Sequence, residues 1–138
     1  MGFELENYLA KAVETEIDDI GLSGLNTYRV SESDDMDYPA VIIMAGGGSE
    51  VVPHSTVYAM SVEISVYSLA DIETDDEHHS RVASIRDALL DTDIEASLKG
   101  HQSGLEVYSV KVGQFSHGVG ENRARESGLT LEVVCSAA

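Results

Sequence analysis

The spacing of apolar residues predicts a helix at the start of the chain. Within residues 5–20 the apolar positions recur every three or four residues, which places them on one side of a helix. Gly21 follows and is placed to end this helix. Glu16, Asp18 and Asp19 crowd the last turn, where the helix dipole disfavours negative charge. We therefore expect screening salt or a partner group to relieve this charge conflict.

Alternation of apolar and polar residues predicts strands in three later segments. Residues 27–31 alternate, residues 40–44 (AVIIM) are apolar on both faces and predict a central strand, and residues 57–68 alternate most regularly. Residues 31–37 (SESDDMD) are predicted to form an acidic loop. Residues 45–56 (AGGGSEVVPHST) are predicted to form a long, glycine-led connection, because glycine permits backbone angles that are closed to other residues.

The sequence TDDEHHSR, which begins at Thr74, raises the question of a metal site, an acid–base pair or only a helix start. Thr74 and Glu77 have the spacing of a capping box, in which the two side chains bond each other's backbone N–H groups. A helix that begins here puts His78 on the same side as Val82 and points His79 elsewhere. The pattern therefore predicts a helix start.

Adjacent histidines do not favour a metal site on this helix. His78 and His79 project about 100° apart, so they cannot share an ion as residues four apart can. The zinc-protease motif, two histidines four apart with a glutamate between them, is absent. We predict no catalytic or metal role for this segment. A small metal-dependent hydrolase that uses His78, His79 and the acids at 75–77 stays as the lesser alternative.

The last third of the chain predicts one more helix and a hairpin. Thr92 and Glu95 again have capping-box spacing and predict a short helix over residues 93–99. A strand, a long polar connection and a second strand follow, over residues 105–115, 116–128 and 128–136. The whole pattern predicts a single α+β domain, residues 1–138, with a mostly antiparallel sheet of about five strands flanked by two main helices.

The charge is strongly and unevenly acidic. The chain has 25 Asp and Glu against 8 Lys and Arg, a net charge of −17, and residues 1–98 hold 21 of the acids and only four of the bases. Such a field repels phosphate, so we predict no sequence-specific binding of nucleic acid. At ~1 M ionic strength the screening length is about 3 Å and self-repulsion nearly vanishes, so the composition favours a halophilic source.

The sequence predicts neither a membrane segment nor a cofactor site. No apolar run reaches the ~18 residues that a membrane-spanning helix needs, and the N-terminus lacks the pattern of a signal peptide. The glycines at 46–48 lack the Lys and Ser or Thr of a phosphate-binding loop. The single cysteine, Cys135, lies on the apolar side of an alternating strand, which predicts a buried, inert thiol. We predict no catalytic residue, no metal and no cofactor.

The order of elements and two segments, YPAVIIM and SVEISVYSLADIETDDEHHSRVASIRDALL, resemble the tail terminator (tail completion) proteins of tailed viruses. In that family a proline-marked strand leads to a long alternating strand. A helix with the pattern Ile-Arg-x-Ala-Leu follows, matched here by Ile85, Arg86, Ala88 and Leu89. The strong acidity departs from the usual composition of the family and fits a virus of a halophilic archaeon.

The resemblance implies a virion structural protein of the tail or neck that is assembled in the host cytoplasm. It implies a homo-oligomeric ring, a hexamer, that caps the tail tube and joins the tail to the neck while DNA passes through the lumen. The implied partners are the tail-tube protein and a neck or head-completion protein. Another neck or tail-tube component is the alternative within the same class.

The two long connections are the segments that we expect to contact these partners. Glycines in the first connection give it the freedom to order on docking. Arginines in the second are rare positive groups in an acidic chain, and they suit a neighbour's acidic surface. The predicted contact residues are Gly46, Gly47, Gly48, Glu50, Arg123 and Arg125.

Overall fold

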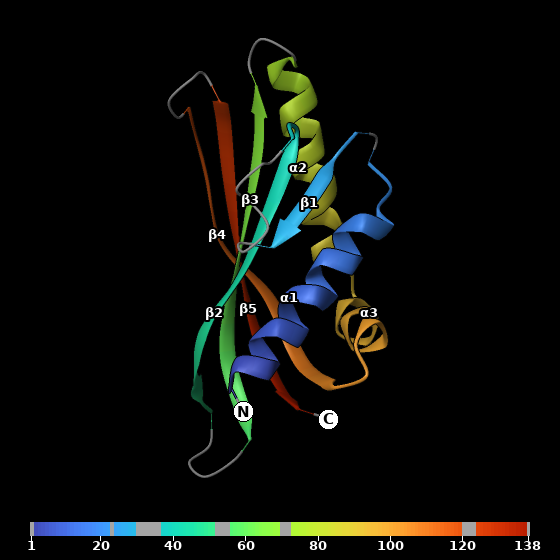
Figure 1. Ribbon diagram of the computed structural model, residues 1–138, viewed down its shortest axis with the longest axis vertical. Helices are drawn as coiled ribbons and strands as arrows, with labels where there is room; N and C mark the ends of the chain where they lie inside the picture. The colour runs from blue at the N-terminus through green and yellow to red at the C-terminus, as the bar shows by residue number, and fades with distance from the viewer. Residues whose placement is uncertain are drawn as a thin grey trace.

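The computed structural model describes residues 2–22, 24–29, 37–51, 56–69, 73–119 and 124–137 (Figure 1). One helix is followed by three strands, two helices and two final strands. In chain order they are α1 (Gly2–Asp19), β1 (Asn26–Arg29), β2 (Ala40–Glu50), β3 (Val57–Leu69), α2 (Asp75–Leu89), α3 (Ile94–His101), β4 (Leu105–Val119) and β5 (Ala124–Ala137). This confirms the predicted α+β fold, with α3 as a short third helix.

The five described strands form one sheet in the order β1-β2-β3-β5-β4. Three of its four pairings are antiparallel, and β1 alone pairs in parallel, with Asn26 opposite Ala40 of β2. The prediction of a mostly antiparallel sheet is therefore confirmed. The apolar segment at 40–44 lies in β2, between two neighbouring strands, as its pattern predicted.

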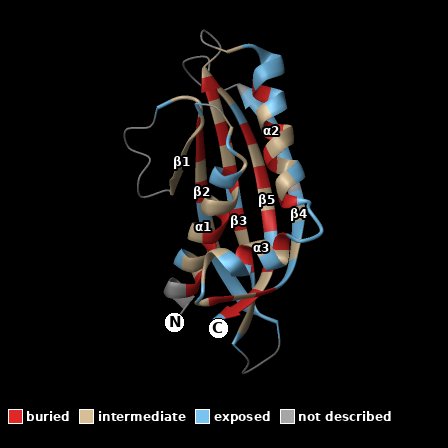
Figure 2. Ribbon diagram, turned by 90° about the vertical axis from the view of Figure 1, so that its right-hand side faces the viewer, coloured by how far each residue is buried: buried red, intermediate tan, exposed pale blue. Residues whose placement is uncertain are grey.

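The helices lie on one side of the sheet, and the core fills the space between (Figures 1 and 2). Alternate residues of the two central strands point into this core, which explains why their apolar positions recur with a period of two. Helix α1 contributes its apolar stripe from the opposite side. The central buried side chains include Leu9, Val13 and Ile17 of α1, Met60, Val62, Ile64 and Val66 of β3, and Leu129, Leu131, Val133 and Cys135 of β5.

The glycine run at 46–48 lies inside a strand, so the predicted long connection at 45–56 is wrong. The β2–β3 register shifts between Ala45 and Gly48, which marks a bulge. A Cβ at Gly48 would lie 2.7 Å from the carbonyl oxygen of Ala59 and from Met60 Cγ. Glycine therefore serves here to let two strands approach closely, and β2 continues to Glu50.

Residues 116–119 and 124–128 also belong to strands, so the predicted long connection over 116–128 is wrong at both of its ends. Strand β4 runs to Val119 and β5 begins at Ala124. Polar residues can continue these strands because one face of the sheet is open to solvent. Strand β3 has 13 residues, which corresponds to a length of about 43 Å at ~3.3 Å per residue. The two hairpin ends lie at opposite ends of this long sheet, since Val57 pairs with Ser136 and Leu69 with Ala124.

The first predicted capping box is present and the second is not. At α2 the Thr74 hydroxyl accepts from the Glu77 backbone N–H at 3.2 Å, and Glu77 Oε1 accepts from the Thr74 N–H at 3.3 Å. Helix α3 instead has Asp93 as its N-cap, without a side-chain capping bond. The Asp91 carboxylate accepts from the Asp93 N–H at 2.9 Å and so stabilises a turn where Thr92 was expected to cap.

Helix α1 ends as its sequence predicted. Gly21 has a φ of +73°, the left-handed conformation that glycine adopts easily, and its N–H donates to the Asp18 carbonyl at 3.1 Å. Among the described residues, no helix is both long and apolar enough to cross a membrane.

Candidate functional site

The face of the sheet opposite the helices is the first candidate interaction surface. We call it the open face and define it by the rows that face away from the core on β3, β5 and β4. Most residues in these rows are polar or charged, in contrast to the apolar rows on the other face. The open face includes Ala59, Ser61, Glu63, Ser65 and Tyr67 of β3, Glu126, Gly128, Thr130, Glu132 and Val134 of β5, and Ser109, Lys111, Ser116 and Gly118 of β4.

The open face carries more negative than positive charge. Glu132 lies between Ser61 and Lys111 on the neighbouring strands, and Glu63 lies opposite Thr130. These rows hold three glutamates and one lysine. Near one end the Tyr67 hydroxyl donates to Glu126 Oε1 at 3.4 Å. Burial, and then the charge of Glu126, raises the pKa of Tyr67, so its hydroxyl stays neutral at physiological pH.

The predicted contact residues do not form one site. Gly46, Gly47, Gly48 and Glu50 lie in β2 near one end of the sheet, and Gly47 and Gly48 line a hollow of about 660 Å³ together with open-face residues. Arg125 lies near the other end, at the start of β5. Arg123 lies outside the described residues. Whether these positions contact partners stays a prediction.

Arg125 is not the free positive group that the sequence suggested. Its Nε forms an ion pair with Asp75 of α2, and its Nη1 donates to the Glu73 carbonyl at 2.9 Å. The side chain is 14% exposed. Arg125 therefore ties the beginning of β5 to the beginning of α2. Sequence alone could not show this, because 50 residues separate the two partners.

A buried hydrogen-bonded network links α2 to the sheet at the same end. His78 is buried, and its ring nitrogens lie 2.8 Å from the hydroxyl oxygens of Ser68 on β3 and Ser127 on β5. His117 of β4 adds a third histidine contact, with Nδ1 2.7 Å from Ser127 Oγ. The sequence placed His78 on the buried side of its helix, which is confirmed. No pattern in the sequence indicated that Ser68, Ser127 and His117 would contact one another or His78.

The network fits a structural role better than a catalytic one. Burial, together with the charges of His79, Arg125, Arg81 and His117, lowers the pKa of His78, so its ring is neutral at physiological pH. Both of its ring nitrogens face hydroxyl groups in hydrogen bonds, so neither is left to bind a metal. A nucleophile must meet its substrate, and Ser127 is 1% exposed.

Cys135 is inert in this fold. Its side chain is 0% exposed and its Sγ lies 3.7 Å from Met60 Sδ. Burial raises the pKa of the thiol to about 11, and only the thiolate is a strong nucleophile. The predicted buried, inert thiol is confirmed.

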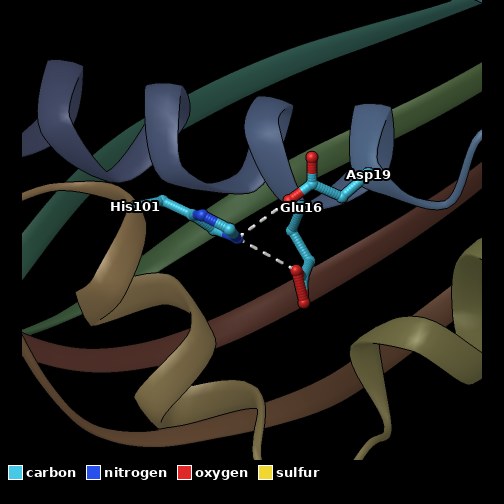
Figure 3. Close-up of side chains that lie close together, drawn as sticks. All are labelled: Glu16, Asp19 and His101. Carbon is cyan, nitrogen blue, oxygen red and sulfur yellow. Dashed lines mark hydrogen bonds and ion pairs between the residues drawn. The ribbon is translucent and has the colours of Figure 1, made fainter.

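A third cluster lies between the ends of two helices (Figure 3). His101, in the last turn of α3, points its Nε2 toward Glu16 Oε2 at 3.1 Å and Asp19 Oδ2 at 3.7 Å. The last turn of α1 has no basic residue of its own. His101 is therefore the partner group that the crowded acids at the end of α1 were expected to need. The acidic crowding was the only feature of the sequence that pointed to this contact, because 85 residues separate Glu16 from His101.

No protein-family model matches the chain, and no curated protein matches it in sequence. Solved structures do match its fold. A chain in the virion of a native gene transfer agent (GTA) particle superposes with a TM-score of 0.65 at 13% identity, over 96% of this chain and 97% of that one. The two chains therefore share a fold over nearly their full lengths.

Two structures from Akkermansia muciniphila, one of them solved without a transmembrane region, match less well. Their TM-scores are 0.41 and 0.42 at 11% identity, over 89% of this chain and 50% and 46% of theirs. These two likenesses are too weak to bear on the fold of this chain.

Proposed function

We propose that this chain is a structural protein of a virion, and that it acts as a tail terminator. In this proposal it forms a closed ring that caps the tail tube and joins the tail to the neck. Support comes from the full-length likeness in fold to a chain of a GTA virion. The resemblance of the sequence to tail terminators points in the same direction.

The open face is the observation that carries the proposal. Helices cover one side of the sheet and leave the other side open, and in the proposed ring this open face is turned toward the lumen. Glu63, Glu126 and Glu132 on the open face would line a lumen with negative charge. Phosphate is repelled by such a surface, so DNA would pass without adhering.

The length of the sheet supports a role between two partners. The β2–β3 end and the β4–β5 end lie at opposite ends of strands about 43 Å long. In the proposed ring one end contacts the tail-tube protein and the other contacts the neck. In this proposal Gly48 and Glu50 lie at the end of the sheet that contacts one of these partners, and Arg125 lies at the end that contacts the other.

Thiol labelling tests which face lines the lumen. The native Cys135 is fully buried, so introduced cysteines report alone. Ser65→Cys places a thiol on the open face, and Ser80→Cys places one on the exposed side of α2 as the matched control. In the assembled ring we expect a small reagent to label both variants. A polymer-linked reagent should label the Ser80→Cys variant much faster than the Ser65→Cys variant.

Equal labelling of both variants by the large reagent would contradict a lumenal open face. The same reagents on the dissociated protein supply the reference rates, because both positions are then accessible. The metal-dependent hydrolase gains no support from residues 74–79, since His78 is neutral and bonded to two serines.

A further inference from the structure

We propose that Glu16, Asp19 and His101 form a zinc-binding site that fastens the end of α1 to the end of α3. The proposal is independent of the virion role. Among the described residues, these three form the one group of His, Cys, Asp or Glu whose candidate ligand atoms all lie within 4.8 Å of one another. Figure 3 shows both carboxylates turned toward the imidazole.

The distances between ligand atoms suit a tetrahedral ion. Zinc binds nitrogen and oxygen at 2.0–2.2 Å, so two ligands of a tetrahedral site lie about 3.3–3.5 Å apart. The Nε2 atom of His101 lies 3.1 Å from Glu16 Oε2 and 3.7 Å from Asp19 Oδ2, which brackets that value. The three candidate ligand atoms all lie within 4.8 Å of one another.

The charge of the cluster also calls for a cation. Two carboxylates meet at the C-terminal end of a helix, where the dipole already adds negative charge. A bound divalent ion would cancel the charge of both carboxylates. The third acid of this turn, Asp18, is engaged elsewhere, since its Oδ1 accepts from the Thr27 hydroxyl at 2.6 Å.

The ligand set and its exposure favour zinc over calcium or magnesium. Calcium and magnesium prefer oxygen ligands alone, whereas imidazole with carboxylate suits zinc and related transition metals. The side chains of Glu16 and His101 are 15% and 19% exposed, and that of Asp19 is 63% exposed. The site is thus closed on the protein side and leaves a fourth position for water.

Zinc titration by calorimetry tests the proposal, with the metal-free protein in ~1 M NaCl to screen diffuse cation binding. The parent should bind one Zn²⁺ per chain, and His101→Gln should weaken binding at least tenfold. Asp18→Asn is the control: it removes one negative charge from the last turn of α1 but no proposed ligand, and it should bind like the parent.

Thermal unfolding gives a second readout, because a metal held only by the folded state raises Tm. Zinc should raise the Tm of the parent and of Asp18→Asn, and not that of His101→Gln. If His101→Gln does not fold by circular dichroism, the Glu16→Gln/Asp19→Asn variant, which keeps the imidazole, replaces it. A parent that binds no zinc would overturn the proposal, and so would a His101→Gln or Glu16→Gln/Asp19→Asn variant that binds as tightly as the parent.

Discussion

His78 Nε2 lies 2.8 Å from Ser127 Oγ, although 49 residues separate the two in sequence. This bond, with the bond from His78 Nδ1 to Ser68, fixes the beginning of α2 against β3 and β5. A neutral imidazole has one donor and one acceptor, and two hydroxyls satisfy both. The network therefore buries a polar side chain without leaving an unpaired group.

Removing the imidazole should destabilise the protein strongly. In His78→Ala the hydroxyls of Ser68 and Ser127 lose a buried partner, which we expect to lower the free energy of unfolding by about 2–4 kcal/mol. His79→Ala is the matched control, because His79 is exposed, and it should change stability by less than about 0.5 kcal/mol. Urea unfolding followed by circular dichroism measures both. Equal costs would contradict the structural role of the network.

The same histidine should make stability depend on pH. The pKa of folded His78 lies below its usual value of 6.5, so between these two values the unfolded chain binds a proton that the folded chain does not. The free energy of unfolding should then fall as pH falls below about 6.5. His78→Gln should lose this part of the dependence, which unfolding of both proteins at pH 7.5, 6.5 and 5.5, chosen as roughly one unit apart, measures. If the free energy of unfolding changed with pH equally in both proteins, His78 would be excluded as the cause of the pH dependence.

The capping box at α2 should be worth about 1 kcal/mol. Thr74→Ala removes the hydroxyl that accepts from the Glu77 N–H, and loss of an N-cap usually costs about that much. Thr92→Ala is the control, since the spacing is alike but the N-cap position of α3 is Asp93 and no side-chain capping bond forms there. We expect almost no effect from it. A substantial cost at Thr92 would mean that the second capping box forms after all.

Salt should stabilise the protein. Residues 1–98 hold 21 acidic and four basic residues, and screening weakens their repulsion. Tm should rise between ~0.1 M and several molar NaCl. Potassium chloride should act similarly if screening is the cause. A Tm that does not change with salt would contradict the halophilic interpretation, which stays a prediction.

The sequence predicted the elements whose signals are local. The alternation around Ile64 and Leu131 identified the two central strands, and Thr74 with Glu77 identified the start of α2. An alternation with a period of two, or a capping box that spans four residues, can be recognised from the local sequence alone.

What the sequence could not predict depends on pairing between distant segments. The glycine run signalled flexibility, but its role emerges only where Gly48 meets Ala59 on the neighbouring strand. Arg125 looked free until the fold brought Asp75 beside it. The candidate zinc ligand His101 likewise meets Glu16 only through the packing of α3 against α1.

The mass of the purified protein in high salt tests the central proposal most directly. Light scattering at ~2 M NaCl and rising concentration should detect a closed ring, with about 89 kDa for six copies of the 14.8 kDa chain. Negative-stain images of the same sample should show rings with a central opening. A protein that stays at 14.8 kDa at every concentration and salt, with no rings in the images, would contradict the account.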